Sequence, residues 1–417
     1  MRGRVTPAAV MSCSFFIVSH CGFPSVMAVI MGEIYGIGAG SFGGIMTSSL
    51  IVTISDDTNY GNRLQNYALT QLLKAYGDCT TAKFAPFVST FHAYYKLQAK
   101  ELLHLSGMKS NVKASLHLLS AEEELERRRL QKMRHFTKEY VTNDCFELTD
   151  YKGLVSKAGA SFDTVVLGSD QIWNPNWLSQ EDLRLRLGSF AQPGVRVISY
   201  AASFGVSVVE DPKAREVFSK YLPHLSSISV REDAGKALVE QLSNREATVV
   251  LDPTLMIPTE KWLSITHSFV PANEKYVLTY FLGKPTERQE QSIQQFAEEH
   301  HCVIRRMLDS RDCKDYVAGP EDFVELFSKA QYVFTDSYHA CCFSILFQKQ
   351  FTVFARAGYN KSKNMNSRME TLFRLFELDA VVSESELAPR VNYVRVNELL
   401  EEHRQESCAW LDAAMGR

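Results

Sequence analysis

Residues 333–356 read V-F-T-D-S-Y-H-A-C-C-F-S-I-L-F-Q-K-Q-F-T-V-F-A-R, and the rest of the chain is interpreted around them. The apolar run Tyr332–Phe334 predicts a β-strand, and the small polar residues Thr335–Ser337 are typical of a helix start. Ala340–Phe347 is apolar except for Ser344, which predicts a buried helix rather than a surface one. A second apolar run, Phe351–Phe354, predicts another strand. The stretch therefore has the strand–helix–strand order of a parallel α/β sheet.

One histidine, His339, stands where the first of these strands opens into the helix. In open α/β sheets, ligands bind outside the carboxyl ends of the strands, and a helix N-terminus favours an anion. Asp336 lies three residues before His339 and is near enough in sequence to orient the imidazole. The alternative is a histidine that only packs in the core. The position at a strand-to-helix turn favours a functional role.

Composition limits the classes of function. The chain has 417 residues, 45% hydrophobic and 22% charged, which is typical of a globular protein with two or three domains. Its net charge of −3 argues against a surface for nucleic acid or anionic membrane. The nine cysteines show no C-x-x-C pair, and Cys341-Cys342 lies in the apolar helix. This usage indicates reduced cysteines rather than a disulfide framework or a zinc site.

The first 45 residues differ from the rest. Ala8–Met31 contains no Asp, Glu, Lys or Arg and follows Arg2 and Arg4, as in a signal peptide or a poor membrane span. Gly38–Gly43 matches G-x-G-x-x-G, but a strand rather than a helix is predicted after it, so we reject a dinucleotide site. The simpler interpretation is that residues 1–45 are a leader and that the fold begins near Met46.

Alternating strands and helices fill the remainder. Leu50–Ile54 predicts a buried strand, followed by a polar loop and an amphipathic helix at Arg63–Tyr76. Residues 91–140 are predicted to be helical, with a solvated charged face. Phe162–Leu167 predicts a strand that ends in a loop with Asp170, Trp173 and Asn174, and further strands follow. We expect an N-terminal unit at 46–253, a second αβ unit at 274–390 and a helical segment at 391–417.

Six ordered motifs make the chain resemble one family. They are Y-G-N-R-L-Q-N-Y-A-L, V-V-L-G-S-D-Q-I-W-N-P, I-S-Y-A-A-S-F-G, S-V-R-E-D-A-G, V-L-D-P-T-L and T-D-S-Y-H-A-C-C-F-S-I-L-F. Together they resemble the polysaccharide pyruvyl transferase family over roughly residues 47–380. The resemblance implies an α/β fold with two Rossmann-like lobes facing across a cleft, as in B-type glycosyltransferases. It also implies transfer of a pyruvyl unit from phosphoenolpyruvate to a sugar as a ketal, with no cofactor and no metal.

The resemblance assigns roles to individual residues. His339 matches the family histidine and is the candidate general acid, and Arg231 matches the arginine of the strand-end R-E motif. Many family members have Arg-Leu-His where this chain has Ser337-Tyr338-His339, so one anion-binding arginine is missing. Arg368 is the expected replacement, since a guanidinium binds phosphate or carboxylate in bidentate fashion.

The remaining candidates are polar residues in predicted loops. Asp336 and Ser337 are expected beside the donor. The acceptor side is expected to comprise Asn59, Gly61, Asn62, Asp170, Trp173 and Asn174. For Asp170 and Asn174, capping of a turn is an equally good interpretation, and Arg231 has the alternative of a structural ion pair with Glu232 or Asp233.

Two other functions compete with pyruvyl transfer. A sugar-nucleotide glycosyltransferase of the same fold would need diphosphate-binding amides and a base pocket in the C-terminal lobe. A non-catalytic carbohydrate-binding relative would lack a cationic pocket around His339. We expect a small-molecule donor and a sugar acceptor, free or linked to lipid or nucleotide, and no nucleic acid or stable membrane span. The expected location is the cytoplasm, either free or at the inner face of the membrane.

Overall fold

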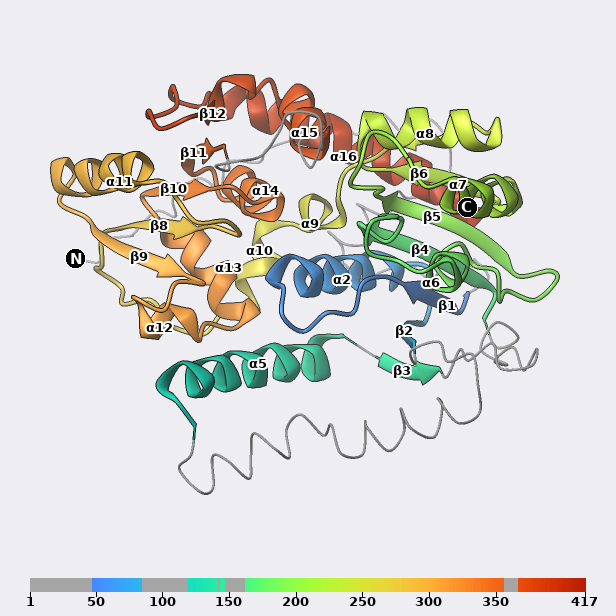
Figure 1. The fold of residues 1–417 in the computed structure, drawn as a ribbon, viewed down its shortest axis with the longest axis horizontal. Helices are drawn as coiled ribbons and strands as arrows, with labels where there is room; N and C mark the ends of the chain where they lie inside the picture. The colour runs from blue at the N-terminus through green and yellow to red at the C-terminus, as the bar shows by residue number, and fades with distance from the viewer. Residues whose placement is uncertain (1–46, 85–118, 142, 147–161, 356–366) are drawn as a thin grey trace, which may run out of the picture.

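Two parallel β-sheets form the framework of the protein. A computed structural model of the chain describes residues 47–84, 119–141, 143–146, 162–355 and 367–417. The first sheet has the strand order β3-β2-β1-β4-β5-β6-β7 and the second the order β12-β11-β10-β8-β9, with every pair parallel. The two sheets lie at opposite ends of the molecule with helices around them (Figure 1). The predicted α/β fold with two Rossmann-like units is confirmed.

The strands of the first sheet alternate with helices that cover it. Its strands are β1 (Ser49–Val52), β2 (Cys79–Phe84), β3 (Asn143–Phe146), β4 (Thr164–Asp170), β5 (Arg196–Ala202), β6 (Ser227–Val230) and β7 (Thr248–Val249). Its helices are α2 (Tyr60–Leu73), α5 (Ala121–Tyr140), α6 (Gln180–Leu185), α7 (Pro212–Tyr221) and α8 (Asp233–Ser243).

The second sheet follows the same plan. Its strands are β8 (Tyr276–Tyr280), β9 (Val303–Met307), β10 (Tyr332–Thr335), β11 (Gln350–Phe354) and β12 (Val382–Ser383). Its helices are α11 (Glu287–Glu299), α12 (Cys313–Tyr316), α13 (Pro320–Lys329), α14 (Tyr338–Leu346) and α15 (Ser367–Phe376).

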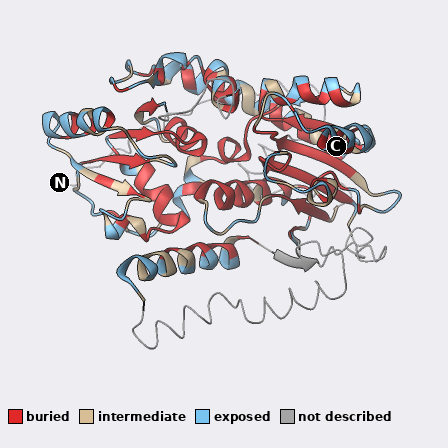
Figure 2. Cartoon of the chain, viewed as in Figure 1, coloured by how far each residue is buried: buried red, intermediate tan, exposed pale blue. Residues whose placement is uncertain are grey.

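The strand–helix–strand unit predicted at 332–354 is present as β10, α14 and β11. All nine residues of α14 are buried, as its mainly apolar sequence predicts. Figure 2 shows the strands and the central helices buried, with exposed residues on the outer faces of α5, α8 and α11.

The first helix begins earlier than its apolar spacing predicts. Asn59 caps α2, because its side-chain oxygen accepts a hydrogen bond from the backbone N–H of Asn62 at 3.3 Å. The helix therefore starts at Tyr60 rather than at Arg63. It is buried on nearly all sides because it lies between the two units, and the Tyr60 hydroxyl donates to the carbonyl of Ala318 at 2.7 Å.

One of the three hydrophobic clusters among the described residues spans both units. A single cluster runs from Ile51 in β1 through the short helices α9 (Pro253–Met256) and α10 (Thr259–Leu263) to Val333 in β10. The long helix α16 (Tyr393–Met415) confirms the predicted C-terminal helix. It returns to the first unit, where Tyr76 donates to Asp412 at 2.7 Å. The first sheet thus ends with β7 in the chain and the second begins with β8. The bounds predicted for separate domains stay a prediction.

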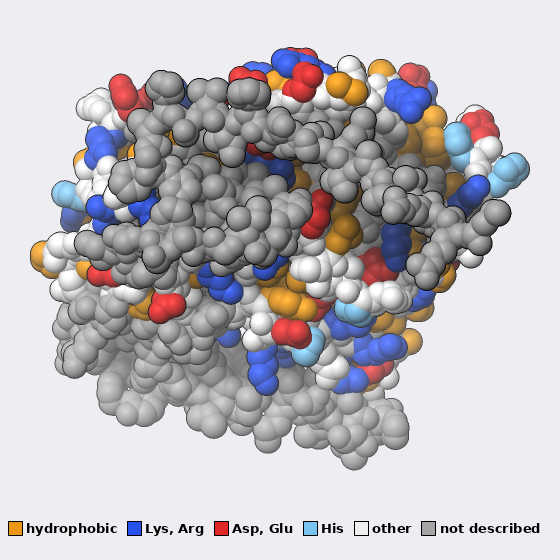
Figure 3. All heavy atoms as spheres, turned by 180° about the vertical axis from the view of Figure 1, so that it is seen from behind, with side chains coloured by type: hydrophobic (Ala, Val, Ile, Leu, Met, Phe, Trp, Pro, Cys, Tyr) orange, Lys and Arg blue, Asp and Glu red, His pale blue; other side chains and the backbone are white. Residues whose placement is uncertain are grey.

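Parts of the predicted organisation lie outside the described residues. These are the leader at 1–45, the N-terminal part of the charged helical region at 91–118, and most of the polar loop at 358–367. Of the charged region, α5 is present and begins at a capping box formed by Ser120 and Glu123. Figure 3 shows acidic and basic side chains intermixed over the visible part of the back face, without a large area of one sign.

Candidate active site

The turn from β10 into α14 is fixed by backbone and carboxylate hydrogen bonds. Ser337 donates its backbone N–H to the Thr335 hydroxyl at 3.0 Å and stands at the N-cap of α14. Asp336 accepts from the backbone N–H groups of Leu282 at 2.7 Å and Gly283 at 2.8 Å. The Asp336 carboxylate therefore joins the turn to the loop after β8. This role differs from the predicted one of orienting His339.

His339 occupies the first turn of α14 and is only 7% exposed. Its Nε2 lies 3.9 Å from the Asp252 carboxylate, beyond hydrogen-bonding distance, and has no partner among the described residues. Burial lowers the pKa of His339, against the opposing effect of the Asp252 and Asp170 carboxylates. The imidazole is therefore neutral at pH 7 in the free protein and has a ring nitrogen available for a ligand.

Gly61 provides the space in which the His339 ring sits. A Cβ atom at position 61 would lie 2.1 Å from Nδ1 of His339 and 2.6 Å from its Cγ. Position 61 is in the first turn of α2, so the backbone of this helix forms a wall of the site. Only glycine allows the helix and the imidazole to approach so closely.

We expect Gly61→Ala to displace the His339 ring and to lower both activity and thermal stability. Overpacking of this kind costs about 1–3 kcal/mol. The double variant Gly61→Ala/His339→Ala isolates the contact, because truncating the imidazole removes the clash. Unfolding by urea measures the loss of stability in the single variant and in the double variant. If Gly61→Ala destabilises equally with and without the imidazole, the contact is not the cause.

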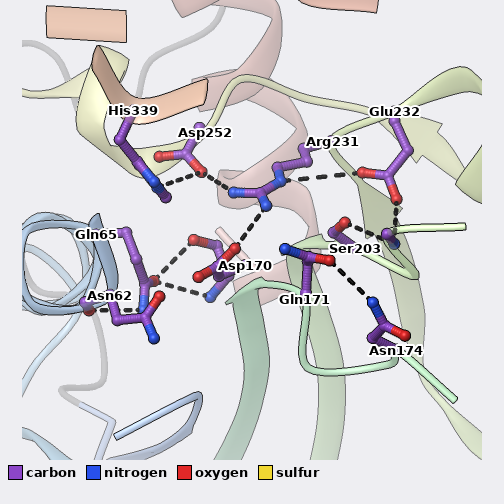
Figure 4. A network of polar contacts seen from close by, with 12 residues as sticks. Asn62, Gln65, Asp170, Gln171, Asn174, Ser203, Arg231, Glu232, Asp252 and His339 are labelled. Carbon is purple, nitrogen blue, oxygen red and sulfur yellow. Dashed lines mark hydrogen bonds and ion pairs between the residues drawn. The ribbon is translucent and has the colours of Figure 1, made fainter. Parts of the chain in front are cut away.

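Arg231 lies at the centre of a buried charged network (Figure 4). Its guanidinium donates to Asp252 at 2.8 Å and to Asp170 at 2.6 Å, and its Nε lies 3.9 Å from Glu232. The Arg231 side chain is fully buried and does not line the cavity described below. The guanidinium holds the pKa of Asp170 below its usual range, despite the burial of that carboxyl. Arg231 therefore positions Asp170 and Asp252 through its two terminal nitrogens, while its Nε has no hydrogen-bond partner among the described residues.

Arg231→Ala should destabilise the protein strongly, because Asp170 and Asp252 would lose their shared cation. Breaking a buried ion pair by removing one partner costs about 3–5 kcal/mol. The control is Arg374→Ala, since Arg374 pairs with Asp233 at the surface, where a pair contributes about 0–1 kcal/mol. Urea unfolding separates the two. A stable Arg231→Ala protein with a raised donor KM would instead show that Arg231 binds the donor.

Asp170 is presented by an uncommon backbone conformation. Its φ is +67°, in the left-handed region that Asp and Asn tolerate better than other residues with a side chain. Behind it, the Ser169 hydroxyl donates to Gln65 of α2 at 2.8 Å, and the Gln65 amide donates to Thr53 at 2.9 Å. These contacts tie the ends of β1 and β4 to α2, so the Asp170 carboxylate has a fixed position at the end of β4.

Arg368, in the first turn of α15, is a buried cation with weak compensation. It is 6% exposed, makes no ion pair with a described carboxylate, and its Nε has no described partner. With the amide oxygen of Gln171 turned toward it, Gln171 accepts from Nη1 at 3.0 Å and Nη2 at 3.3 Å. Burial lowers the pKa of Arg368 to about 10, and Arg231 adds to this effect. A buried guanidinium in this state favours an anionic ligand.

Tyr338 brings the two guanidinium groups together. Its ring lies 4.5 Å from the Cζ of Arg231 and 5.8 Å from the Cζ of Arg368, measured to the ring centroid. Both distances are within the range of a cation–π contact. Tyr338 therefore offsets part of the repulsion between the two cations.

These groups open into a cavity of about 1060 Å³ between the two units. Its wall on the first unit includes Ile54, Asp56, Asn59, Asn62, Asp170, Gln171 and Trp177. Its wall on the second unit includes Leu282, Thr286, Arg288, Asp336, Ser337, Tyr338, His339, Phe354, Arg368, Glu370, Phe373, Val382 and Glu384. The predicted cleft between two lobes is therefore present, with His339 and Arg368 both at its surface.

The family model for "Polysaccharide pyruvyl transferase" matches residues 59–358, which is more than half of the chain. The chain belongs to the polysaccharide pyruvyl transferase family. This is a family of enzymes, and the predicted membership is confirmed. A polysaccharide pyruvyl transferase acts on a donor and a sugar acceptor. A comparison with curated proteins gives no match.

Solved structures similar to this pyruvyl transferase family member are distant. The UDP-GlcNAc 2-epimerase of Methanocaldococcus jannaschii is 12% identical with a TM-score of 0.40, covering 85% of this chain and 92% of that chain. The epimerase of Neisseria meningitidis bound to UDP-GlcNAc is 12% identical with a TM-score of 0.38, covering 86% and 100%. An alpha-glucosyltransferase in complex with UDP and DNA is 9% identical with a TM-score of 0.41, covering 88% and 94%.

Most of the predicted site residues meet at the cavity of this family member. Those that line it are Asn59, Asn62, Asp170, Asp336, Ser337, His339 and Arg368, and Gly61 lies against the His339 ring. Arg231, Trp173 and Asn174 lie behind this surface. Trp173 is fully buried, and its indole N–H donates to the Arg186 carbonyl at 2.9 Å. It is a packing residue that supports the loop.

Four residues of the site were not among the predicted ones. Asp252 contributes the carboxylate near His339, and Gln171 the amide that contacts Arg368. Tyr338 contributes the ring between the two cations, and Trp177 an aromatic part of the cavity wall. Asp252 stands between β7 and Pro253, where a polar residue at a strand end is a usable signal. Nothing in the sequence distinguishes Trp177 from Trp173.

Within the described part of the chain, no cluster of three or more His, Cys, Asp or Glu side chains is arranged to hold a metal ion. A search of those same residues finds no helix with the length and apolar character needed to span a membrane.

Proposed function

We propose that the enzyme transfers the pyruvyl group of phosphoenolpyruvate to two hydroxyls of a sugar and forms a pyruvate ketal. The observation that carries this proposal is the pairing of Arg368 with His339 in one cavity. Arg368 is a buried cation that lacks a carboxylate partner among the described residues, and His339 has an unpartnered ring nitrogen. An anionic donor that also needs a proton satisfies both groups.

Arg368 and the N-terminus of α14 form the proposed donor site. A guanidinium binds a phosphate or carboxylate in bidentate fashion, and a helix N-terminus adds backbone N–H groups and a favourable dipole. Ser337, at the N-cap, makes no capping hydrogen bond with its side chain, so its hydroxyl is available to the donor. Arg368 thereby supplies the positive charge that many family members have at the position of Ser337. Arg231 contributes indirectly by holding Asp170 and Tyr338.

His339 is the proposed general acid and base. As the imidazolium it gives a proton to the methylene carbon of phosphoenolpyruvate, which generates cation character at C2. The first acceptor hydroxyl adds to C2 and returns a proton to His339. The second hydroxyl then forms its bond to C2 as the C2–O bond to phosphate breaks, and the phosphate leaves with the proton of that hydroxyl. The products are the ketal and inorganic phosphate, and no oxidant is required.

The neutral state of His339 in the free protein is compatible with this role. An anionic donor placed beside the imidazole favours its charged form. Donor binding therefore promotes protonation of His339, and the first step uses this proton.

The competing function is that of a glycosyltransferase that uses a nucleoside diphosphate sugar. The described lining contains the carboxylates Asp56, Asp170, Asp336, Glu370 and Glu384 and the guanidinium groups Arg288 and Arg368. Phosphoenolpyruvate and a nucleoside diphosphate both bring negative charge to this lining, so ligand binding has to distinguish them. The buried Arg368 beside His339 argues against a non-catalytic relative, because an uncompensated buried cation costs stability without a ligand.

Thermal shift with donor fragments tests the proposal. Phosphoenolpyruvate should raise Tm more than inorganic phosphate or pyruvate alone, since only the intact donor carries both a phosphate and a carboxylate. UDP should have little effect. A larger shift with UDP than with phosphoenolpyruvate would favour the glycosyltransferase. Because phosphoenolpyruvate is a cytoplasmic metabolite, we place the reaction in the cytoplasm.

A further inference from the structure

We propose that Trp177 is the platform on which a neutral acceptor sugar stacks, with the Asn62 amide hydrogen-bonded to one of its hydroxyls. This inference rests on the proposed function and specifies its acceptor side. It assigns the aromatic role to Trp177 rather than to Trp173. It also narrows the acceptor to an uncharged glycan unit rather than a nucleoside diphosphate.

Trp177 is an apolar side chain held at the cavity surface. It is 59% exposed, whereas Trp173 and Trp262 are fully buried. Leu282 and Val382, on the second unit, are also exposed large apolar residues that line the cavity. Exposed apolar groups gathered at a polar cavity mark a binding surface. Among the described lining residues, the rings of Tyr338, Phe354 and Phe373 are buried, and Trp177 is the aromatic side chain that is largely exposed.

The position of Trp177 is set by the turn after β4. Its backbone N–H donates to the Asn174 carbonyl at 3.4 Å, and the Asn174 side chain accepts from the N–H of Asn176 at 3.0 Å. The buried Trp173 anchors the same turn through its hydrogen bond to Arg186. The exposure of the Trp177 indole is thus a property of an ordered turn.

Asn62 provides the polar counterpart. It is 6% exposed and lines the cavity, yet its side-chain amide makes no hydrogen bond to another described residue. Because this amide is accessible from the cavity, a ligand bound there can hydrogen-bond to it directly. A sugar hydroxyl satisfies an amide as donor and as acceptor. The unmet amide lies in the turn of α2 that also holds Gly61 against His339, so a sugar bound there would be near the reacting carbon.

The shape of a pyranose suits this pair of groups. One face of the ring is made of C–H groups, which pack on an aromatic surface, while the hydroxyls radiate from its edge. Aromatic side chains with a large flat surface favour such contacts. Asp56, Glu370 and Glu384 are exposed carboxylates at the cavity, where they can accept from hydroxyls and repel phosphates. These charges favour a neutral sugar.

The volume of the cavity accommodates both substrates. Pockets for drug-sized ligands measure roughly 300–1,000 Å³, and this one measures about 1060 Å³. A three-carbon enol phosphate fills a small part of it beside Arg368. The remainder is large enough for an acceptor of more than one sugar ring.

Intrinsic fluorescence tests the platform without turnover. Lactose, maltose and cellobiose at roughly 10 mM, above the usual KM range, are added with and without phosphoenolpyruvate, and UDP is the anionic comparison. At least one sugar should shift the emission to shorter wavelength, because it shields the exposed Trp177. Trp177→Phe should abolish the shift. Trp410→Phe, on α16 outside the cavity, should retain it.

Kinetics of phosphate release provide the second readout. With the most active sugar, Trp177→Ala should raise the acceptor KM by roughly tenfold or more and leave the donor KM unchanged. Trp177→Phe should recover most of the loss, because it retains an aromatic face. Asn62→Ala should also raise the acceptor KM.

The outcomes separate this inference from the proposed function. Three results would overturn the acceptor platform. These are an emission shift caused by UDP and by none of the sugars, the absence of a shift with every sugar, and a normal acceptor KM in Trp177→Ala. Failure of phosphoenolpyruvate to bind would instead overturn the donor assignment, and the sugar-induced shift would still be readable. A sugar shift that survives Trp177→Phe and disappears in Trp410→Phe would place the sugar elsewhere.

Discussion

Replacing His339 with glutamine is expected to lower kcat by about 10²–10⁴-fold, the usual loss when a general acid is removed. Glutamine is close in size to histidine, so the contact with Gly61 and the fold of α14 should persist. Phosphate release from phosphoenolpyruvate in the presence of an acceptor measures the loss. Circular dichroism and Tm show whether the fold is retained.

The proton on His339 gives this prediction a second readout. Burial lowers the pKa of His339 in the free protein, and a bound anion raises it. Between these two values the complex binds one more proton than the free protein, so donor affinity should fall as pH rises. Calorimetry in buffers of different ionisation enthalpy measures this proton uptake. His339→Gln should abolish the part contributed by the imidazole.

The control is His403→Gln, on α16 and outside the cavity, where Nδ1 contacts Glu406 at 3.0 Å. It should leave kcat and the proton uptake unchanged. Near-full activity of His339→Gln would show that His339 only packs in the core. The proposed mechanism would then be wrong.

Arg368→Ala should raise the donor KM by about ten- to a hundredfold. A hydrogen bond to a charged group contributes about 1.5–3 kcal/mol, and each 1.4 kcal/mol corresponds to about a factor of ten. Arg368→Lys should recover only part of the loss, because lysine lacks the planar fork. The measurement is the dependence of initial rate on phosphoenolpyruvate at saturating acceptor.

Stability distinguishes a binding cation from a structural one. Arg368 carries a buried charge without a described carboxylate partner, so Arg368→Ala should leave the Tm of the free protein unchanged or raise it. The same variant should lose the stabilisation by phosphoenolpyruvate. Arg374→Ala, on the same helix but at the surface, should change neither. A destabilised Arg368→Ala with a normal donor KM would make Arg368 a structural residue.

The fold was predictable from sequence where a segment is mainly apolar. The strand–helix–strand unit at 332–354 is such a case, since most residues of its buried helix α14 are apolar. The α2 helix shows the limit of this approach. Its first turn carries Gly61, Asn62 and Arg63, which look like a loop in sequence, and the capping hydrogen bond of Asn59 makes it helical.

The position of the site was predictable from the sequence, but the roles of its individual residues were not. Arg368 was expected as the replacement cation, and it lines the cavity. Arg231 was expected to bind the donor, but Asp170 and Asp252, distant in sequence, already accept from its two terminal nitrogens. Two tryptophans four positions apart have opposite environments, because the turn after β4 points Trp173 into the core. Such distinctions depend on tertiary contacts that a local pattern does not contain.

The most direct test of pyruvyl transfer is incubation of the enzyme with carbon-13-labelled phosphoenolpyruvate and a panel of neutral glycans. The account predicts stoichiometric release of inorganic phosphate and a labelled ketal carbon, bonded to two sugar oxygens, in the NMR spectrum of the glycan. Arg368→Ala and His339→Gln should suppress both signals. Absence of label from every glycan, with sugar transfer from a nucleoside diphosphate sugar instead, would contradict it.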